Sequence, residues 1–326
     1  MQLVYSLEDI QPEDVDTHGG KATNLARLAH LGFRVPRTFS ISSRAFVQMI
    51  ENNPDLASLL ERADGTDDFE ELLELSVKLQ KAISDYEMPE QLQKEILEGY
   101  SNLREKMESC EYGFAVRSSA TIEDRSDISF AGQAESYLCC MTEADVISSV
   151  KRVWQSAYSE RAVIYLKTKE IPLKQVKMAV IIQEMMSADV SGVMFTANVV
   201  NNDTDEMLIN ATWGFGDSLV SGKVVPDTFI IKKTPLKIIQ KNLGKKELTS
   251  QLENNQQILI PTPREKQTVY SLEDRTLLDI AEVGMKIESS MESPQDIEWC
   301  IRSDNSLAII QSRPITTLKF PSSDEV

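Results

Sequence analysis

The segment from residue 295 to 315, QDIEWCIRSDNSLAIIQSRPI, limits the possible folds more than any other stretch of this chain. Polar residues recur at a spacing of two on both sides of the turn-forming residues 303–306, SDNS: Asp296 and Glu298 before them, Gln311 and Arg313 after them. Alternation with period two on either side of such a turn predicts a β-hairpin with one apolar face. A turn of these four residues places Arg302 opposite Leu307 and fixes the register of the two strands.

This register predicts a polar cluster on one face of the hairpin. Counting back from the turn places Glu298 opposite Gln311 and Asp296 opposite Arg313. Because side chains alternate along a strand, all four project from the same face. The apolar residues of the segment then project from the other face, which we expect to be core: Ile297, Trp299, Ile301, Ala308 and Ile310.

Two interpretations of this cluster remain open from the hairpin alone. One is an exposed face with a cross-strand ion pair. The other is a site for a magnesium-bound polyphosphate, because carboxylate and amide oxygens are ligands for Mg²⁺ and an arginine offers paired donors to phosphate.

Composition narrows the possible partners. The 326-residue chain has 34 Lys and Arg against 51 Asp and Glu, a net charge of −17, which argues against broad electrostatic binding to nucleic acid or to a membrane surface. No run approaches the length of a membrane span, the first residues do not resemble a signal peptide, and the four cysteines show no CxxC spacing. We therefore expect a soluble cytoplasmic protein with reduced thiols, and an anion can bind only through a few placed groups.

The order of the remaining patterns favours an α+β fold with two lobes. Helical spacing of apolar residues predicts helices over about 21–31, twice within 66–103, over 142–169 and over 273–289. Strand-like runs follow in the second half, as in KMAVIIQEMM, SGVMFTA and MLINATWGFG.

Two further segments are candidates for binding an anion. Gly19-Gly20-Lys21 at a helix start offers backbone N–H groups and a lysine charge, and an ordinary turn ahead of a helix is the alternative. His18, beside this turn, is expected to be an exposed loop residue. The run VRSSATIEDRSDISFAGQ combines Arg117 with hydroxyl and glycine residues, and a solvated surface loop is its alternative.

Six pieces of the sequence, in order, resemble one known family. They are GGKATNLARL, FAVRSSATIEDRSDISFAGQAESYL, QEMMSADVSGVMFTAN, ATWGFGDSLVSGKVVPD, DIEW and IIQSRPIT. They are similar to the ATP-binding domain of the phosphoenolpyruvate synthase, pyruvate phosphate dikinase and rifampin phosphotransferase family. The resemblance implies an α+β ATP-grasp domain over 1–318, in which two lobes of about 1–180 and 181–318 clamp Mg-ATP. The lobes would contain mixed or antiparallel sheets with flanking helices. Residues 319–326 would begin a linker.

The resemblance also implies roles for individual residues. The phosphates of ATP would be bound by the candidate catalytic residues, Lys21, Arg117 and Arg313. A loop over the phosphates would contain Gly132 and Ser136. The adenine and ribose would contact Gln183, Glu184 and Met186. Mg²⁺ would be held by Glu298 and Gln311, which also places them in the nucleotide site. For Asp296, metal contact and orientation of Arg313 both remain open.

In function, the resemblance implies the phosphoryl-donating half of a dikinase-type phosphotransferase. ATP would give AMP and phosphate, and its β-phosphoryl group would pass to a histidine on a swivelling domain, in a longer chain or in trans. Pyruvate or a rifamycin antibiotic would then receive it. No histidine-bearing or acceptor-binding segment matches within this sequence. One departure, Asp217 where relatives usually have Glu, puts the behaviour of that loop in doubt. The alternative function is a non-catalytic ATP sensor or interaction module.

Overall fold

The computed structural model describes residues 2–107, 112–121, 135–253 and 256–318. The chain divides into two compact units. The first comprises Met1–His30 and Arg37–Met185, and the second comprises Leu31–Pro36 and Met186–Val326. The short segment 31–36 thus belongs to the second unit, although the first surrounds it in sequence. The predicted linker start at 319–326 lies outside the described residues.

The first unit is built on an antiparallel sheet, which has five strands among the described residues, in the order β1-β2-β5-β3-β4. Its strands are β1 (Val4–Ser6), β2 (Thr38–Ile41), β3 (Phe114–Ala120), β4 (Ser136–Cys140) and β5 (Met178–Glu184). β3 and β5 are buried over most of their length, and β4 forms one edge.

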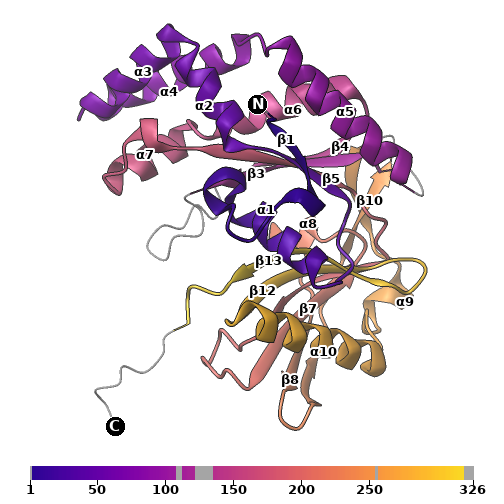
Figure 1. Ribbon diagram of the computed structural model, residues 1–326. Helices are drawn as coiled ribbons and strands as arrows, with labels where there is room; N and C mark the ends of the chain where they lie inside the picture. Colours follow the sequence, from indigo (N-terminus) through magenta and orange to yellow (C-terminus); the bar gives the residue numbers. More distant parts are fainter. Residues whose placement is uncertain (1, 108–111, 122–134, 254–255, 319–326) are drawn as a thin grey trace. The chain divides into compact units, whose positions relative to one another are not determined.

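Helices cover both faces of this sheet (Figure 1). They are η1 (Leu7–Asp9), α1 (Val15–His30), α2 (Ser43–Glu51), α3 (Pro54–Gly65), α4 (Phe69–Asp85), α5 (Glu90–Lys106), α6 (Glu143–Ser156), α7 (Glu160–Thr168) and η2 (Leu173–Gln175). Two contacts assign the faces. Tyr100 of α5 packs against Phe114, with ring centroids 5.0 Å apart, whereas α1 approaches the other face at Ser119. Arg117 and Ser119 therefore face α1, because alternate residues of β3 share a face.

Local sequence explains where several of these helices begin. α6 starts with a reciprocal capping box, in which the Thr142 hydroxyl accepts from the Asp145 N–H and the Asp145 side chain accepts from the Thr142 N–H. α3 starts with Asn53 as N-cap and Pro54 in the first turn. α1 is kinked at Gly19, whose φ of 71° and ψ of 166° are not helical. The helical run after this kink agrees with the predicted helix over about 21–31.

The second unit contains an antiparallel sheet, with six strands among the described residues, in the order β13-β12-β6-β7-β8-β9. Its strands are β6 (Val190–Phe195), β7 (Glu206–Trp213), β8 (Asp227–Lys232), β9 (Lys237–Asn242), β12 (Gln295–Ile301) and β13 (Leu307–Pro314). The remaining elements are the hairpin of β10 (Leu248–Glu253) and β11 (Gln256–Pro261), and the helices α8 (Asp217–Val220), α9 (Arg264–Gln267) and α10 (Asp274–Met291).

α10 packs on one face of the six-stranded sheet (Figure 1). A Cβ atom added to Gly284 of α10 would lie 2.6 Å from the sulfur of Met194 and 2.6 Å from Cε of Met207, so the helix and sheet are in close contact there. Met194 pairs with Ile297 across β6 and β12, which places Ile297 on the α10 face. Glu298, the next residue, therefore projects from the opposite face.

The terminal hairpin has the predicted polar pairs but a different register near its turn. Glu298 pairs with Gln311 and Asp296 with Arg313, as predicted. The turn is one residue shorter than predicted, because the Arg302 N–H donates to the Ser306 carbonyl.

A β-bulge compensates for the shorter turn. Trp299 pairs with Ile309, so Ile310 is the extra residue between this pair and the next. The predicted core position of Ile310 is therefore wrong: it is only half-buried, whereas Ile309 is buried at 2% exposure. The other four residues predicted for the apolar face are buried.

Segment 31–36 lies against the edge of this hairpin. The Ile309 N–H donates to the Arg34 carbonyl at 2.9 Å, and the Arg34 guanidinium lies 3.7 Å from the Asp304 carboxylate in the turn. These contacts cover part of the otherwise open edge of β13, which is the first strand of its sheet.

The second unit also contains a fully buried ion pair. Lys246 donates to Asp227 at 2.5 Å, and the side chains of both residues have 0% exposure. The same carboxylate accepts from the Gly244 N–H at 2.8 Å and from the N–H and hydroxyl of Ser271 at 2.7 and 2.8 Å. The pair therefore joins β8 to two loops that are distant in sequence.

No helix among the described residues combines the length and the apolar character that a membrane crossing requires.

Candidate functional site

Arg117 is the centre of a polar cluster in the first unit. From β3, its Nε donates to the Ser136 hydroxyl at 3.4 Å and one of its terminal nitrogens donates to Oε1 of Gln183 at 3.3 Å. Ser136 is the first residue of β4, and Gln183 lies near the end of β5 and is 3% exposed. Three residues predicted from separate segments are thus brought together by adjacent strands.

Lys21 reaches the same strand from α1. Its Nζ donates to the carbonyl of Ser118, the residue after Arg117, at 3.1 Å. The Ala22 N–H donates to the Ser119 hydroxyl at 3.3 Å, so the Gly19-Gly20-Lys21 turn is fixed against β3. Two cationic side chains therefore belong to one small region, which is the arrangement that an anion such as a polyphosphate requires in an acidic protein.

His18 does not have the predicted exposed position. It is 2% exposed, its Nδ1 lies 3.0 Å from the Ser40 hydroxyl, and the Tyr5 ring packs edge-on against it. Burial lowers the pKa of His18 below its ordinary value, with Arg44 adding to this effect and Asp14 opposing it. The prediction was wrong because Tyr5 of β1 and Ser40 of β2 pack against His18, and both strands are supplied by other parts of the chain.

Glu184 is held at the end of β5 by the residue that follows segment 31–36. Its backbone N–H donates to the Arg37 carbonyl at 2.8 Å, and its carboxylate accepts from the Arg37 N–H at 3.3 Å. The Arg37 guanidinium lies 3.8 Å from the same oxygen. Met186 is half-buried and is the first residue of the second unit after Glu184 and Met185. The predicted site residue Gly132 lies outside the described residues.

The second unit contributes the cluster on the hairpin. Glu298 and Gln311 are direct cross-strand partners, and Gln311 is 8% exposed. Beside them, Nε and a terminal nitrogen of Arg313 contact the same Asp296 oxygen at 2.9 and 2.8 Å. Of the two roles left open for Asp296, orientation of Arg313 is the one that the geometry shows.

The charges around Asp296 oppose one another. Burial raises the pKa of the Asp296 carboxyl above its usual range, Arg313 acts in the opposite direction, and the nearby negative charge of Glu298 raises the pKa further. The net direction is upward, so the loss of hydration outweighs the attraction of the arginine. Asp296 and Glu298 therefore form a carboxylate pair that a bound cation would stabilise.

The donor set on the hairpin fits Mg²⁺ bound together with phosphate. Mg²⁺ prefers oxygen ligands, and commonly takes one or two carboxylates with the rest of its shell from water and substrate phosphates. Glu298 offers a carboxylate and Gln311 an amide oxygen from directly opposed positions. The neighbouring side chain of Arg313 is 43% exposed and thus accessible to an anion.

Some contacts of these clusters were not predicted. Ser118 and Arg37 contact the predicted site residues Lys21 and Glu184, and Ser119 contacts Ala22, the residue after Lys21. Each lies far in sequence from the residue that it contacts. The run VRSS contains both serines, but nothing local indicates that they meet the GGK turn. Arg37 follows Pro36, and a proline indicates only that the residue before it is extended. It does not indicate that Arg37 contacts Glu184.

Comparison with known proteins agrees with this description. Residues 15–326 match the family model described as "Pyruvate phosphate dikinase, AMP/ATP-binding domain". A probable phosphoenolpyruvate synthase of Pyrococcus abyssi is 35% identical, over 100% of this chain and 45% of its own length. A rifampicin phosphotransferase of Streptomyces sviceus is 33% identical, over 98% of this chain and 36% of its own length. The chain thus spans less than half the length of these relatives.

The family match covers nearly the whole chain, so the resemblance inferred from the six motifs is confirmed. The α+β architecture with antiparallel sheets agrees with the predicted ATP-grasp fold class. This chain belongs to the pyruvate phosphate dikinase AMP/ATP-binding domain family.

Proposed function

We propose that the chain binds Mg-ATP and serves as the phosphoryl-donating part of a dikinase-type phosphotransferase. The observation that carries the proposal is the direct pairing of Glu298 with Gln311, next to an arginine that Asp296 orients. The family description as an AMP/ATP-binding domain supports it. The two named relatives, a phosphoenolpyruvate synthase and a phosphotransferase, support the reaction class.

The polar clusters divide the work of binding the nucleotide. Lys21 and Arg117 of the first unit, and Arg313 of the second, neutralise phosphate oxygens. Gln183, Glu184 and Met186 contact the adenine and ribose, and Ser136 and Gly132 belong to the phosphate region. Glu298 and Gln311 hold Mg²⁺, which supplies charge neutralisation at the phosphates when bound. In an acidic chain, these few placed groups replace a general positive surface.

The proposed reaction uses ATP, water and a histidine of a separate domain. The bond between the β-phosphorus and the oxygen that bridges it to the α-phosphorus breaks, with its electron pair leaving on AMP, and the β-phosphorus forms a bond to the histidine nitrogen. The β–γ anhydride is cleaved by water, which releases inorganic phosphate and leaves phosphohistidine. The phosphohistidine domain lies in a longer chain or acts in trans, and pyruvate or a rifamycin is the final acceptor. Such transfers are accelerated mainly by positioning and by stabilising charge on the phosphoryl oxygens.

Titration with a non-hydrolysable ATP analogue tests the assigned site. With adenylyl imidodiphosphate and MgCl₂, we expect saturable binding that Glu298→Ala or Arg313→Ala weakens about tenfold or more, a loss of about 1.4 kcal/mol. Omitting Mg²⁺ should reduce the difference between wild type and Glu298→Ala, because that residue acts through the metal. Unchanged affinity in both variants contradicts the assignment.

A second assay separates the phosphotransferase from a sensor. The chain is mixed with ATP, Mg²⁺ and the histidine domain of a related enzyme, and AMP and phosphate are measured. Formation of AMP that requires the histidine of the added domain supports the phosphotransferase. Nucleotide binding without any AMP formation supports a non-catalytic ATP-binding module instead.

A further inference from the structure

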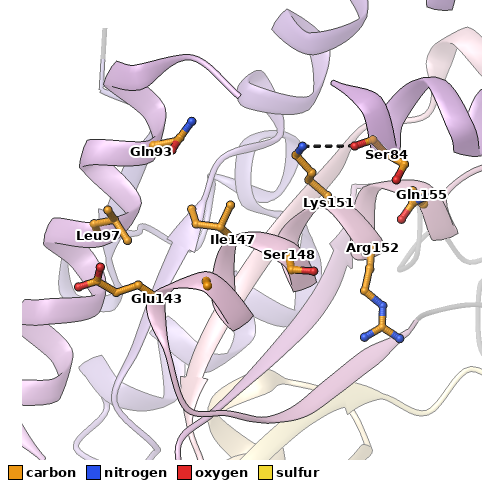
Figure 2. A pocket seen from close by; sticks show the side chains of 10 residues that line it. Ser84, Gln93, Leu97, Glu143, Ile147, Ser148, Lys151, Arg152 and Gln155 are labelled. Atoms are coloured by element: carbon orange, nitrogen blue, oxygen red, sulfur yellow. Dashed lines mark hydrogen bonds between the residues drawn. The ribbon is translucent and has the colours of Figure 1, made fainter. Parts of the chain in front are cut away.

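Arg152 of α6 connects a surface cavity with the strand that carries Ser136. A cavity of about 560 Å³ lies among α4, α5 and α6, and its lining includes Ser84, Gln93, Lys151 and Arg152. Figure 2 shows that Lys151 and Arg152 extend in opposite directions from their helix. Lys151 donates to the Ser84 carbonyl at 3.3 Å.

On its other side, Arg152 stacks on Tyr137 of β4. The guanidinium carbon lies 3.8 Å from the centroid of the Tyr137 ring. The Tyr137 hydroxyl donates to the Glu135 carboxylate. The stacked pair therefore lies at the beginning of β4, on the face of the sheet that α6 covers.

Ser136, the residue before Tyr137, links this contact to the phosphate cluster. Ser136 lies between Glu135 and Tyr137, and its hydroxyl accepts from Arg117 on the opposite face of the sheet. Alternation along the strand means that the orientation of Tyr137 fixes the orientation of Ser136. A path of direct contacts thus runs from Arg152 through Tyr137 and Ser136 to Arg117.

Among the described residues, few contacts other than the stacked pair hold the beginning of β4 in place. β4 is an edge strand, and its pairing with β3 is irregular between Phe114 and Val116. Near its start, the backbone is held by the Ser118 N–H, which donates to the Glu135 carbonyl at 3.2 Å, and by the pairing of Arg117 with Ser136. In this setting a stacked arginine is a substantial part of what orders the strand.

We propose that Arg152 is a positioning residue for the phosphate cluster. By stacking on Tyr137 it fixes the start of β4, and thereby the position of Ser136 against Arg117. The inference rests on the proposed function, which assigns the phosphate contact to Arg117. Arg152 itself does not contact the nucleotide.

Lys151 provides a matched control, because it is the adjacent residue, carries the same charge and lines the same cavity. With adenylyl imidodiphosphate and MgCl₂, we expect Arg152→Ala to raise Kd about fivefold, the factor that about 1 kcal/mol of lost cation–π stacking gives. Lys151→Ala should change Kd less than about twofold, because Lys151 contacts the Ser84 carbonyl of α4 and not β4. Equal effects of the two substitutions overturn the inference.

Three further measurements separate positioning from a general loss of stability. Guanidinium chloride at a low, non-denaturing concentration should restore affinity to Arg152→Ala more than sodium chloride does, since the cavity admits a small cation. Tyr137→Phe, which keeps the ring, should bind like wild type, whereas Tyr137→Ala should bind like Arg152→Ala. In a protein that already carries Ser136→Ala, adding Arg152→Ala should raise Kd little further. If Arg152→Ala raises Kd as much in that background as in the wild type, or if guanidinium does not restore affinity, the path through Ser136 is contradicted.

An NMR measurement without nucleotide keeps this inference separate from the proposed function. The backbone amide signals of Ser136 and Arg117 should shift in Arg152→Ala and stay in place in Lys151→Ala. If they do not shift, the inference fails even when ATP binds. If they shift and the wild type does not bind the analogue, the proposed function fails and the structural coupling stands.

Discussion

The close approach of α1 to β3 can be tested by adding one methyl group at Gly19. A Cβ atom there would lie 2.4 Å from the Ser119 carbonyl oxygen and 2.5 Å from its hydroxyl oxygen, and the residue has φ of 71°. Gly32 is a suitable comparison, because its φ is 83° but a Cβ atom would have no neighbour within 4 Å. Gly19→Ala therefore combines backbone strain with a clash, whereas Gly32→Ala has the strain alone.

The expected magnitudes follow from these contacts. Positive φ costs an alanine about 1–2 kcal/mol in the left-handed region. At Gly19, where ψ is 166°, the cost is about 1–3 kcal/mol. Overpacking against a backbone atom costs about 1–3 kcal/mol more, and this cost applies only to Gly19→Ala. We therefore expect a loss of unfolding free energy of about 2–6 kcal/mol for Gly19→Ala and about 1–2 kcal/mol for Gly32→Ala.

Urea unfolding followed by circular dichroism measures both losses, and analogue titration measures the effect on binding. Because Lys21 is two residues from Gly19, a displaced turn also moves its Nζ from the Ser118 carbonyl. Gly19→Ala should therefore bind adenylyl imidodiphosphate more weakly, and Gly32→Ala should bind it like wild type. Equal losses of stability in the two variants would refute the argument that the Gly19 turn is pressed against β3.

Three other predictions concern charged residues. Because burial dominates the raised pKa of Asp296, its ionised form is disfavoured in the folded state. Asp296→Asn should then be at least as stable as wild type at neutral pH, and this advantage should shrink as pH falls through the folded pKa. Its analogue affinity should nevertheless drop, which urea unfolding and titration at several pH values would show. Arg37→Ala should weaken binding of the analogue, because Arg37 holds Glu184 in place. A double-mutant cycle with Glu184→Ala should give a coupling free energy of about 0.5 kcal/mol or more. If the two substitutions have additive effects on the binding free energy, the contact is unimportant. Asp227→Asn should cost about 3–5 kcal/mol by leaving Lys246 buried without its counter-charge, whereas a loss under about 1 kcal/mol in urea unfolding would contradict that environment.

Much of the hairpin was predictable because its pattern is local. Alternation with period two and a turn are both visible in the sequence, and they gave the pairing of Glu298 with Gln311. The turn length and the bulge at Ile310 were not visible, since an isoleucine in a strand has no mark that distinguishes an extra residue. The polar pairs were nevertheless correct, because the shorter turn and the additional residue compensate for one another.

The contacts between distant segments were not predictable in the same way. The GGK turn and Ser119 are each recognisable as polar features, but their meeting depends on how α1 packs on the sheet. The burial of His18 has the same origin. The family resemblance assigned roles to the residues that the sequence pattern had singled out and added the remaining site residues, and the structure adds which residues contact them.

The assignment of residues 31–36 to the second unit has a practical consequence for dissecting the protein. An expression boundary drawn at residue 186 would omit these residues, and with them the Arg34 carbonyl that accepts from Ile309. The exposed margin of β13 would then offer its backbone groups to other molecules, which is a common route to aggregation. A fragment of the second unit should therefore be supplemented with the peptide GFRVP and its neighbours, by permutation or fusion, to remain monodisperse.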